Sequence, residues 1–409
     1  MTRIAFFHPA LQIPGGAEFL CVDEARYLQE QGEEIEFVTL SYDPDVWRKR
    51  LNGIPVHLSR KRHWTDPFFG LSKMAKLRTR GRRAASELAK YDIAVAHNHP
   101  CNAMLGASGL TLRKVWQCNE PPRGLHVEEA NPRLTQFVKS VDCPEGELFV
   151  GWKKIIKNQT EAMQKGSSHA IRTRYDIEQT AHLDHIFAIS EFSRDNARKI
   201  YGRCGEQVVY PMVRFPEGGR TRSGLDRSGL NVLVHSRLET LKNIDMVLQG
   251  FAKFELTHPG AHLHIVGDGS ARLNLESQAR TLLNNRSFTF HGYLSDEDLR
   301  RVYDRCDVFA LLTLDEPFGM VYPEAAAKGL LLIGPDHGGP YEILEGGRLG
   351  WCINPFAPEA MARALEEVWA LSDEEVDRRR IEADRVCRAR FSREIIGPQL
   401  RRVILEGHD

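Results

Sequence analysis

Hydrophobic residues occur along this chain in short runs that are separated by longer stretches with helical spacing. Residues 3–7 form such a run, which ends in a segment rich in Pro and Gly before apolar residues return at helical spacing from Ala17. This order predicts a strand, a glycine loop and a helix. Further strands are predicted over 34–40, 93–96, 114–117 and 185–189. Because helices separate these strands, we expect parallel pairing through crossovers.

The same alternation returns after residues 216–229 (PEGGRTRSGLDRSG), whose composition is typical of a linker. Strands are predicted over 231–235, 262–266, 287–291, 307–313 and 330–333. We therefore expect two α/β domains, 1–215 and 230–385, followed by a helical segment, 386–409, that packs back on the first domain. Two such domains would leave a cleft between the carboxyl ends of their strands, where α/β sheets bind ligands.

Composition narrows the class of protein. The 409 residues are 42% hydrophobic and 27% charged, as in globular proteins, and 55 Lys and Arg balance 55 Asp and Glu. A net charge of zero gives no general attraction for nucleic acid. No apolar run reaches the length of a transmembrane helix, and the first residues do not resemble a secretory signal, so we expect a cytoplasmic protein. The eight cysteines are spread singly and are expected to be reduced.

One segment departs from this balance. Between Arg60 and Lys90, ten Lys and Arg residues face only two acidic residues, and Trp64, Phe68 and Phe69 lie among them. Basic residues with aromatic neighbours suit an anionic lipid surface, which predicts peripheral membrane contact at the inner face of the plasma membrane. A solvated helix followed by a loop is the alternative interpretation.

Two features have the chemistry of a phosphate site. Gly15 and Gly16 lie between the first strand and first helix, where backbone N–H groups can approach a phosphate, although a glycine turn without a ligand has the same pattern. Arg237 and Lys242 follow the first strand of the second domain. Two cations there can converge on a diphosphate, while a pair of surface cations is the alternative.

Two acidic residues follow the strand predicted over 307–313. Glu316 lies in a Pro- and Gly-containing loop, and Glu324 lies in the first turn of a helix expected to begin near Gly319 or Met320. Carboxylates accept hydrogen bonds and repel anions, so they suit sugar hydroxyls better than phosphate. By contrast, Asp296 and Asp298 follow Ser295 as in a capped helix, which favours a helix start over a metal motif. Asp43-Pro44-Asp45 is likewise predicted to form a turn.

Taken together, these motifs resemble those of the retaining GT-B glycosyltransferases of family 4. The resemblance rests on Gly15-Gly16-Ala17-Glu18, Ala188 to Ser193, Arg237 with Lys242, Gly267-Asp268-Gly269, Glu316 to Glu324, and Gly338-Gly339 with Glu342. It implies two Rossmann-like domains facing each other across a cleft, with a nucleotide-diphosphate sugar as donor and no metal or other cofactor. A glycolipid, polysaccharide or other glycan would be the acceptor.

The resemblance also implies roles for single residues. Arg237 and Lys242 would bind the diphosphate, Glu316 the donor sugar, and Glu324 the ribose. His97, after the strand ending at Ala96, would approach the sugar, although His99 competes for this role. The remaining positions that would contact the donor are Gly15, Gly16, Gly267, Gly292, Tyr293, Phe318, Gly319 and Met320.

The chain departs from the family pattern at Ser236, where glycine is usual, and at Thr240-Leu241 before the lysine. Neither change removes a charge. The alternatives to a transferase are a sugar-nucleotide epimerase of GT-B fold and a nucleotide-sugar binding pseudo-enzyme. Retention of two cations and two acids where the bond breaks favours the transferase.

Overall fold

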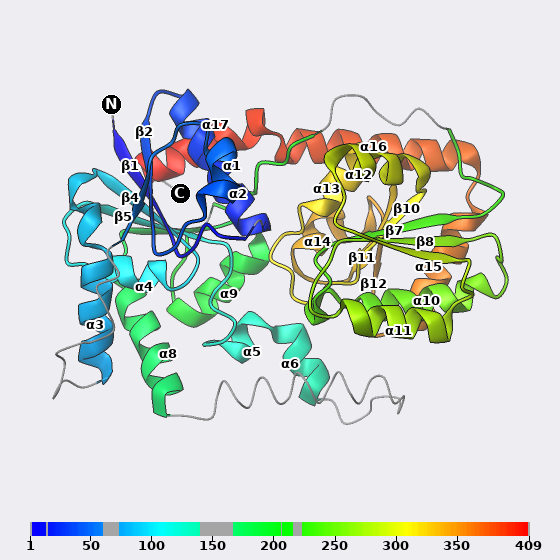
Figure 1. The fold of residues 1–409 in the computed structure, drawn as a ribbon, viewed down its shortest axis with the longest axis horizontal. Helices are drawn as coiled ribbons and strands as arrows, with labels where there is room; N and C mark the ends of the chain where they lie inside the picture. Colours follow the sequence, from blue (N-terminus) through cyan, green and yellow to red (C-terminus); the bar gives the residue numbers. More distant parts are fainter. Residues whose placement is uncertain are drawn as a thin grey trace. The chain divides into compact units, whose positions relative to one another are not determined.

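The computed structural model describes residues 2–13, 15–59, 73–139, 167–205, 207–215 and 223–407. The chain divides into two compact units (Figure 1). Unit 1 comprises Met1–Met212 and Glu394–Asp409, and unit 2 comprises Val213–Arg393.

Unit 1 contains a parallel sheet of six strands in the order β3-β2-β1-β4-β5-β6. The strands are β1 (Arg3–His8), β2 (Glu34–Thr39), β3 (Val56–Leu58), β4 (Ile93–His97), β5 (Arg113–Cys118) and β6 (His185–Ala188). The helices are α1 (Gly16–Glu30), α2 (Pro44–Leu51), α3 (Lys73–Ala84), α4 (Cys101–Gly106), α5 (Val127–Ala130), α6 (Pro132–Lys139), α8 (Ser167–Thr180), α9 (Glu191–Tyr201) and α17 (Arg393–Leu405), with a 3-10 turn η1 (Ser86–Lys90).

Alternating residues of β1 supply the two layers of the core of unit 1. Ile4 and Phe6 pack with residues of α1, α2 and α17, whereas Ala5 and Phe7 pack with residues of α4 and α9. All four side chains are fully buried, as expected of a central strand in a sheet covered on both faces. The last helix of the chain, α17, is therefore part of the core of unit 1.

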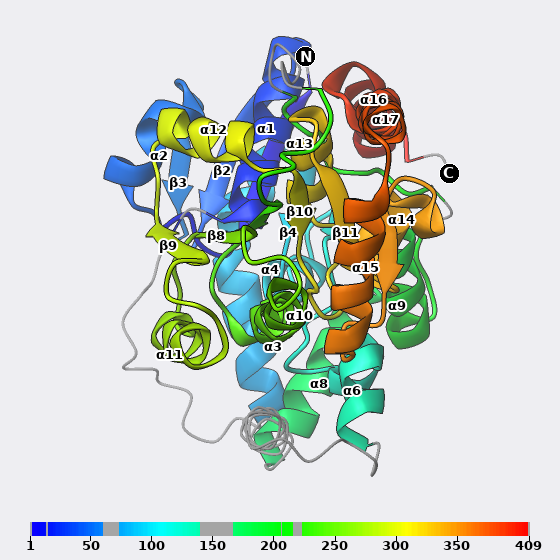
Figure 2. The ribbon, with the colours of Figure 1, turned by 90° about the vertical axis from the view of Figure 1, so that its right-hand side faces the viewer.

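Unit 2 repeats this architecture, with six parallel strands in the order β12-β11-β10-β7-β8-β9. The strands are β7 (Asn231–His235), β8 (His262–Val266), β9 (Phe288–Gly292), β10 (Val308–Ala310), β11 (Leu331–Pro335) and β12 (Trp351–Ile353). The helices are α10 (Ile244–Glu255), α11 (Arg272–Leu282), α12 (Asp296–Arg305), α13 (Val321–Ala327), α14 (Gly338–Ile343), α15 (Pro358–Ala370) and α16 (Asp373–Phe391), with 3-10 turns η2 (Thr240–Lys242) and η3 (Glu345–Gly347). Helices α10 and α15 pack side by side on one face (Figure 2).

The α/β class is confirmed, and most of the expected strands are present, but three local expectations were wrong. Strand β10 is shorter than the range 307–313, because the chain leaves the sheet after Ala310. Strands β3 and β12, each of three residues, were not predicted. Asp43, expected in a turn, is instead the N-cap of α2 and accepts a hydrogen bond from the Asp45 amide.

Candidate active site

The loop after β7 is held against the loop after β8 by backbone hydrogen bonds. The Leu238 amide donates to the Asp268 carbonyl at 2.9 Å, and the Ala271 amide donates to the Leu238 carbonyl at 2.8 Å. At Gly267, where φ is 120°, a Cβ would lie 1.9 Å from the Ser236 carbonyl oxygen. Glycine is therefore needed at position 267 for the two loops to approach each other.

This packing leaves Arg237 on the surface. Its side chain is exposed, and its guanidinium has no hydrogen-bond or ion-pair partner within the described ranges. Ser236, which replaces the expected glycine, donates its hydroxyl to the Arg237 carbonyl at 3.0 Å. The arginine is thus a cation with its donors available to an anionic ligand.

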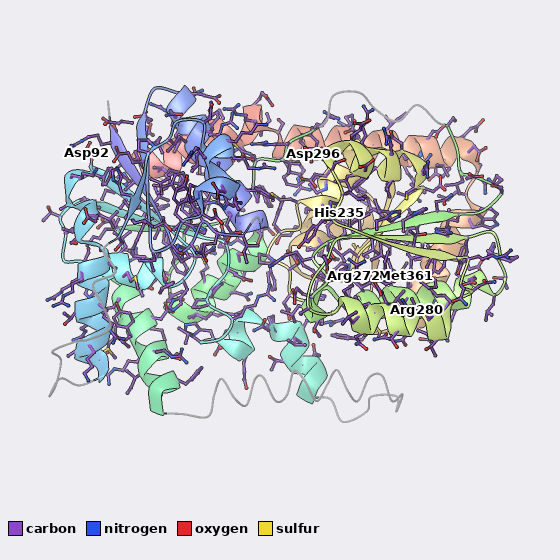
Figure 3. The ribbon with its side chains drawn as sticks, viewed as in Figure 1. Asp92, His235, Arg272, Arg280, Asp296 and Met361 are labelled. Atoms are coloured by element: carbon purple, nitrogen blue, oxygen red, sulfur yellow. The ribbon has the colours of Figure 1, made fainter. Side chains whose placement is uncertain are left out.

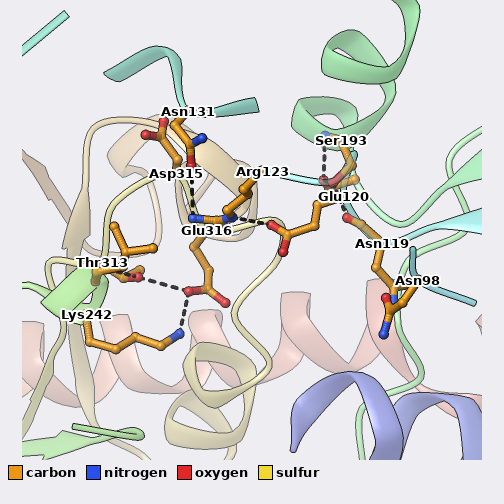
Figure 4. Close-up of polar contacts among 12 residues, drawn as sticks. Asn98, Asn119, Glu120, Arg123, Asn131, Ser193, Lys242, Thr313, Asp315 and Glu316 are labelled. Carbon is orange, nitrogen blue, oxygen red and sulfur yellow. Dashed lines mark hydrogen bonds and ion pairs between the residues drawn. The ribbon is translucent and has the colours of Figure 1, made fainter. Parts of the chain in front are cut away.

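Lys242 and Glu316 form an ion pair at the carboxyl end of the sheet of unit 2 (Figure 4). The Lys242 Nζ lies 2.6 Å from the Glu316 Oε2, which also accepts a hydrogen bond from the Thr313 hydroxyl at 2.9 Å. Both charged side chains are about 20% exposed. Asn243, in the left-handed conformation, follows η2 and donates its side-chain amide to the carbonyls of Leu312 and Pro355, which anchors the lysine loop.

The loop that carries Glu316 packs against the loop after β11. The Gly339 amide donates to the Glu316 carbonyl at 2.8 Å, and a Cβ at Gly339 would lie 2.4 Å from the Phe318 Cα. The Asp315 amide donates to the His337 Nε2 at 3.1 Å. The two glycines of the 338–339 motif therefore let two loops meet closely.

Two predicted contact residues in this loop have different surroundings. The Phe318 ring is buried and meets the Phe391 ring edge-on at a centroid distance of 5.2 Å. Its side chain is thus occupied in the core, and any contact with a ligand would come from its backbone. Gly319, at φ 95°, and Met320, the N-cap of α13, lead into the helix.

Glu324 lies in the first turn of α13, as predicted. Its carboxylate has no hydrogen-bond or ion-pair partner among the described residues, and burial raises its pKa to about 7. The Tyr303 hydroxyl, whose pKa is raised by burial and by the charge of Glu324, bonds to the His235 Nδ1 at 2.9 Å. His235 ends β7 (Figure 3), so this contact connects α12 to the end of the first strand of unit 2.

Gly292 ends β9 with φ 68°, and its carbonyl accepts the Gly267 amide at 2.9 Å. An added Cβ at Gly292 would lie 3.2 Å from the Arg272 Nη1. Arg272 is held by Asp268 and Glu276, each at 2.8 Å. Tyr293, which follows, is 76% exposed. Of these two predicted donor contacts, Gly292 thus lies next to an arginine that is already paired, and Tyr293 presents an exposed aromatic ring.

In unit 1, the glycine loop leads directly into α1. Gly15 is the N-cap, and Gly16 is the first helical residue. The Glu18 carboxylate occupies the space beside Gly15, since a Cβ there would lie 2.5 Å from Glu18 Oε2. The helix N-terminus is thus neutralised by an internal carboxylate.

The two histidines after β4 differ in burial. His97 is fully buried and stacks on Phe6 at a centroid distance of 4.9 Å. Neither of its ring nitrogens has a hydrogen-bond partner among the residues that the structure describes. Burial lowers its pKa well below the usual range. The His99 side chain is 30% exposed, and its Nδ1 lies 3.2 Å from the Asp176 Oδ1. Of the two, His99 is the one that reaches the surface.

One further predicted feature, the capped helix at Ser295, can be placed in the structure. Ser295 caps α12 and accepts the Asp298 amide at 3.2 Å, which confirms the helix start at Asp296 (Figure 3). In the described part of the chain, no three His, Cys, Asp or Glu residues group as metal ligands, and no helix is long and apolar enough to cross a membrane. Trp64, Phe68 and Phe69 lie outside the described residues.

The structure thus brings Lys242 and Glu316 into contact, and joins the loops that carry Gly267, Arg237 and Gly292 through backbone bonds. Sequence reasoning missed two residues of this site, Thr313 and Arg272. Thr313 precedes Glu316 by three residues at a predicted strand end, and Arg272 follows Asp268 by four, a spacing typical of ion pairs on helices. Both signals were present in the sequence.

Comparison with known proteins identifies the family and the fold of this chain. Residues 220–386 match the model of the family described as glycosyl transferases group 1. A glycogen synthase of Mycobacterium tuberculosis is 33% identical over 322 residues, which cover 73% of this chain and 71% of that protein. A mannosylfructose-phosphate synthase of Agrobacterium fabrum is 34% identical over 160 residues, 36% of this chain and 35% of its own length.

A solved structure has the same fold over the whole chain. HepE of Anabaena, crystallised with UDP and glucose, superposes with a TM-score of 0.72 at 16% identity, covering 99% of this chain and 100% of that one. At this identity the likeness shows the GT-B fold. From the family match and the extended similarity to glycogen synthase, we conclude that this chain belongs to the glycosyl transferases group 1 family and is a glycosyltransferase.

Proposed function

We propose that this enzyme transfers a sugar from a nucleotide-diphosphate sugar to a hydroxyl group of a glycan or glycolipid, with retention of anomeric configuration. The observation that carries the proposal is the Lys242 and Glu316 pair, which lies, like the exposed Arg237 on the loop after β7, at the carboxyl ends of the strands of unit 2. Ligands of open α/β sheets bind at that edge. HepE, which has the same fold, was solved with UDP-glucose.

Arg237 and Lys242 supply the positive charge that the leaving diphosphate requires. Charge develops on the leaving group as the glycosidic bond breaks, and preorganised cations stabilise that charge. Glu316 already accepts hydrogen bonds from Lys242 and Thr313 through Oε2. We propose that the Glu316 carboxylate accepts from donor-sugar hydroxyls, and that Glu324 accepts from the ribose.

From unit 1 we propose that His99, rather than His97, faces the sugar. His97 was predicted for this role, but its ring is fully buried, whereas His99 reaches the surface. We also propose that Gly16 meets the diphosphate from unit 1, which requires the Glu18 carboxylate to move away from the start of α1.

We propose that the acceptor lies at an anionic membrane surface on the cytoplasmic side. Helix α3 supports this, because the described side chains of this helix include five basic residues and no acidic one (Lys76, Arg78, Arg80, Arg82 and Arg83). The test is sedimentation with anionic vesicles at low and high salt. Absence of binding at low salt would remove the membrane from the proposal.

The donor is identified by a thermal-shift screen with UDP-, GDP- and ADP-sugars. A ligand that binds only the native state raises stability by RT ln(1 + [L]/Kd). The selected donor is then incubated with candidate acceptors, and the anomeric configuration of the product is read by NMR. An isomerised donor without transfer would indicate an epimerase, and donor binding without turnover would indicate a pseudo-enzyme; either result would contradict the proposal.

A further inference from the structure

Unit 1 contains a fully buried carboxylate, Asp176, in the middle of α8. Its Oδ1 receives the Asn102 side-chain amide at 2.9 Å and the His99 Nδ1 at 3.2 Å. Its Oδ2 receives the His126 Nε2 at 2.9 Å and the Tyr201 hydroxyl at 2.6 Å. One side chain is thus bonded by four others, which come from three other segments of unit 1, because His99 and Asn102 both lie at the start of α4.

Asp176 is ionised in this setting. Burial alone would raise its pKa, but the hydrogen bonds from His126, His99 and Tyr201 together hold the pKa well below its usual range. An ionised carboxylate can only accept hydrogen bonds. Each of the four partners must therefore donate, and His99 donates through Nδ1–H.

This requirement decides the tautomer of His99. In a neutral imidazole, one nitrogen carries the proton and the other has a free lone pair, and the bond made by the first fixes the state of the second. With Nδ1–H directed at Asp176, Nε2 of a neutral His99 is a hydrogen-bond acceptor, whereas a doubly protonated ring would donate from both nitrogens. Asp176 and Asn102 are fully buried, whereas the His99 side chain is 30% exposed. Of these three side chains, His99 is therefore the one that a ligand can contact.

We infer that Asp176 is a positioning residue, which presents the Nε2 lone pair of His99 to a hydroxyl group of the bound sugar. The inference rests on the proposed function, in which His99 faces the substrate. A sugar hydroxyl can donate to a bare nitrogen, whereas the opposite tautomer would offer a second donor at the same place. The competing explanation is that Asp176 only joins four segments of the fold.

Substituting Asp176→Asn tests the inference, because the amide keeps the shape but loses the charge that requires four donors. We expect kcat to fall about 10- to 100-fold, as for other residues that orient a functional histidine. The matched control is Tyr201→Phe, which removes one bond to the same carboxylate and leaves the His99 side intact. We expect its kcat to stay within about twofold of wild type, and an equal loss in both variants would overturn the inference.

A double variant distinguishes a role of Asp176 in positioning His99 from a purely structural role. If Asp176 acts through His99, adding Asp176→Asn to His99→Ala lowers Tm but does not lower kcat further. A further fall in kcat of tenfold or more would overturn the inference, since Asp176 would then act independently of His99. Wild-type turnover in His99→Ala would do so as well.

A spectroscopic readout keeps the test independent of transfer activity. In protein with ¹⁵N-labelled histidine, assigned by difference against His99→Ala, the wild type should show His99 protonated at Nδ1 alone, and Asp176→Asn should change this state. Protonation of wild-type His99 at Nε2 would overturn the inference even with an active enzyme. Failure of the proposed function would instead appear as the absence of transferred product from wild type, while the tautomer could still be measured.

Discussion

The two sheets of this glycosyltransferase have the same connectivity, with the first strand of each unit at the centre and the order reversing beside it. Their carboxyl ends differ in charge. In unit 2 this edge carries Arg237, Lys242 and Glu316. In unit 1 the corresponding ends of β1 and β4 carry His8 and His97. Burial lowers the pKa of His8 to about 4 and holds that of His97 well below its usual value.

The comparison shows that a shared topology fixes where a ligand can bind but not which ligand binds. In both sheets, the carboxyl ends of the strands form the edge at which a ligand can bind. Because burial keeps His8 and His97 neutral, the ends of β1 and β4 carry no positive charge at these two positions, whereas unit 2 offers two cations. An anionic leaving group is thus expected to bind unit 2.

Removing a cation from unit 2 should have the largest effect on turnover. Lys242→Ala and Arg237→Ala should each lower kcat about 10²- to 10³-fold at saturating donor, the usual cost of removing one group that stabilises transition-state charge. Steady-state kinetics with the selected donor measures this. Lys253→Ala is the matched control, since Lys253 forms an exposed pair with Glu359, and its kcat should not change. Near wild-type turnover in both site variants would show that the charge difference between the units has no catalytic role.

Glu24, a buried acid in unit 1, should have the largest effect on stability, through its dependence on pH. Gln117 donates to Glu24 at 2.7 Å, but burial still raises the pKa of Glu24 to about 8. The folded state therefore binds a proton that the unfolded state releases near pH 4.5, so stability falls as pH rises from about 4.5 to 8. This effect amounts to about 5 kcal/mol.

The neutral variant Glu24→Gln should lose this dependence. Chemical denaturation of variant and wild type across pH 4 to 9 should give curves that diverge as pH rises, with the variant more stable at pH 8. Parallel curves would mean that Glu24 is ionised in the folded state, so that unit 1 would contain a buried negative charge.

The affinity of unit 2 for the donor should depend on pH through Glu324. If ionised Glu324 accepts hydrogen bonds from the ribose, donor affinity should rise about tenfold between pH 6 and 8, because its pKa is about 7. Calorimetric titration with the nucleotide diphosphate measures this change. Glu324→Gln should bind equally at both pH values, and the same slope in the variant would assign the pH dependence to another group.

The smallest expected effects concern helix caps, one from each unit. Asp43→Ala at the start of α2 and Ser295→Ala at the start of α12 should each destabilise the protein by about 1 kcal/mol. Asp43→Asn keeps a capping oxygen and serves as the control. Thermal unfolding followed separately in the two units would show whether each loss stays within its own unit; a stronger effect of the asparagine than of the alanine would contradict the capping role.

The sequence predicted the strands best where they are long and apolar, as in β1 and β8. Short strands such as β3 and β12 were missed, because three residues carry too little periodicity to distinguish them from loops. Asp43 was read as part of a turn because Asp before Pro favours both a turn and a helix start.

In the site, the kinds of side chain were predictable and their partners were not. Glu316 was expected to bind a sugar and Lys242 a diphosphate, yet the two bond to each other across 74 positions of sequence. The order of residues favoured His97 over His99, since it follows its strand directly. His97 is buried against Phe6 from another strand, and for this reason we propose His99 for the role instead.

The amino-acid sequence alone determined the order of strands and helices, the glycine positions and the presence of two cations and two acids, because these follow from local spacing and residue chemistry. Tertiary structure decided which of these groups are paired, buried or exposed, since each outcome depends on residues distant in sequence. Gly267 and Gly339 show the division most directly. Both could be recognised as motif glycines, but only the packing of neighbouring loops shows that a Cβ at either position would collide with the backbone.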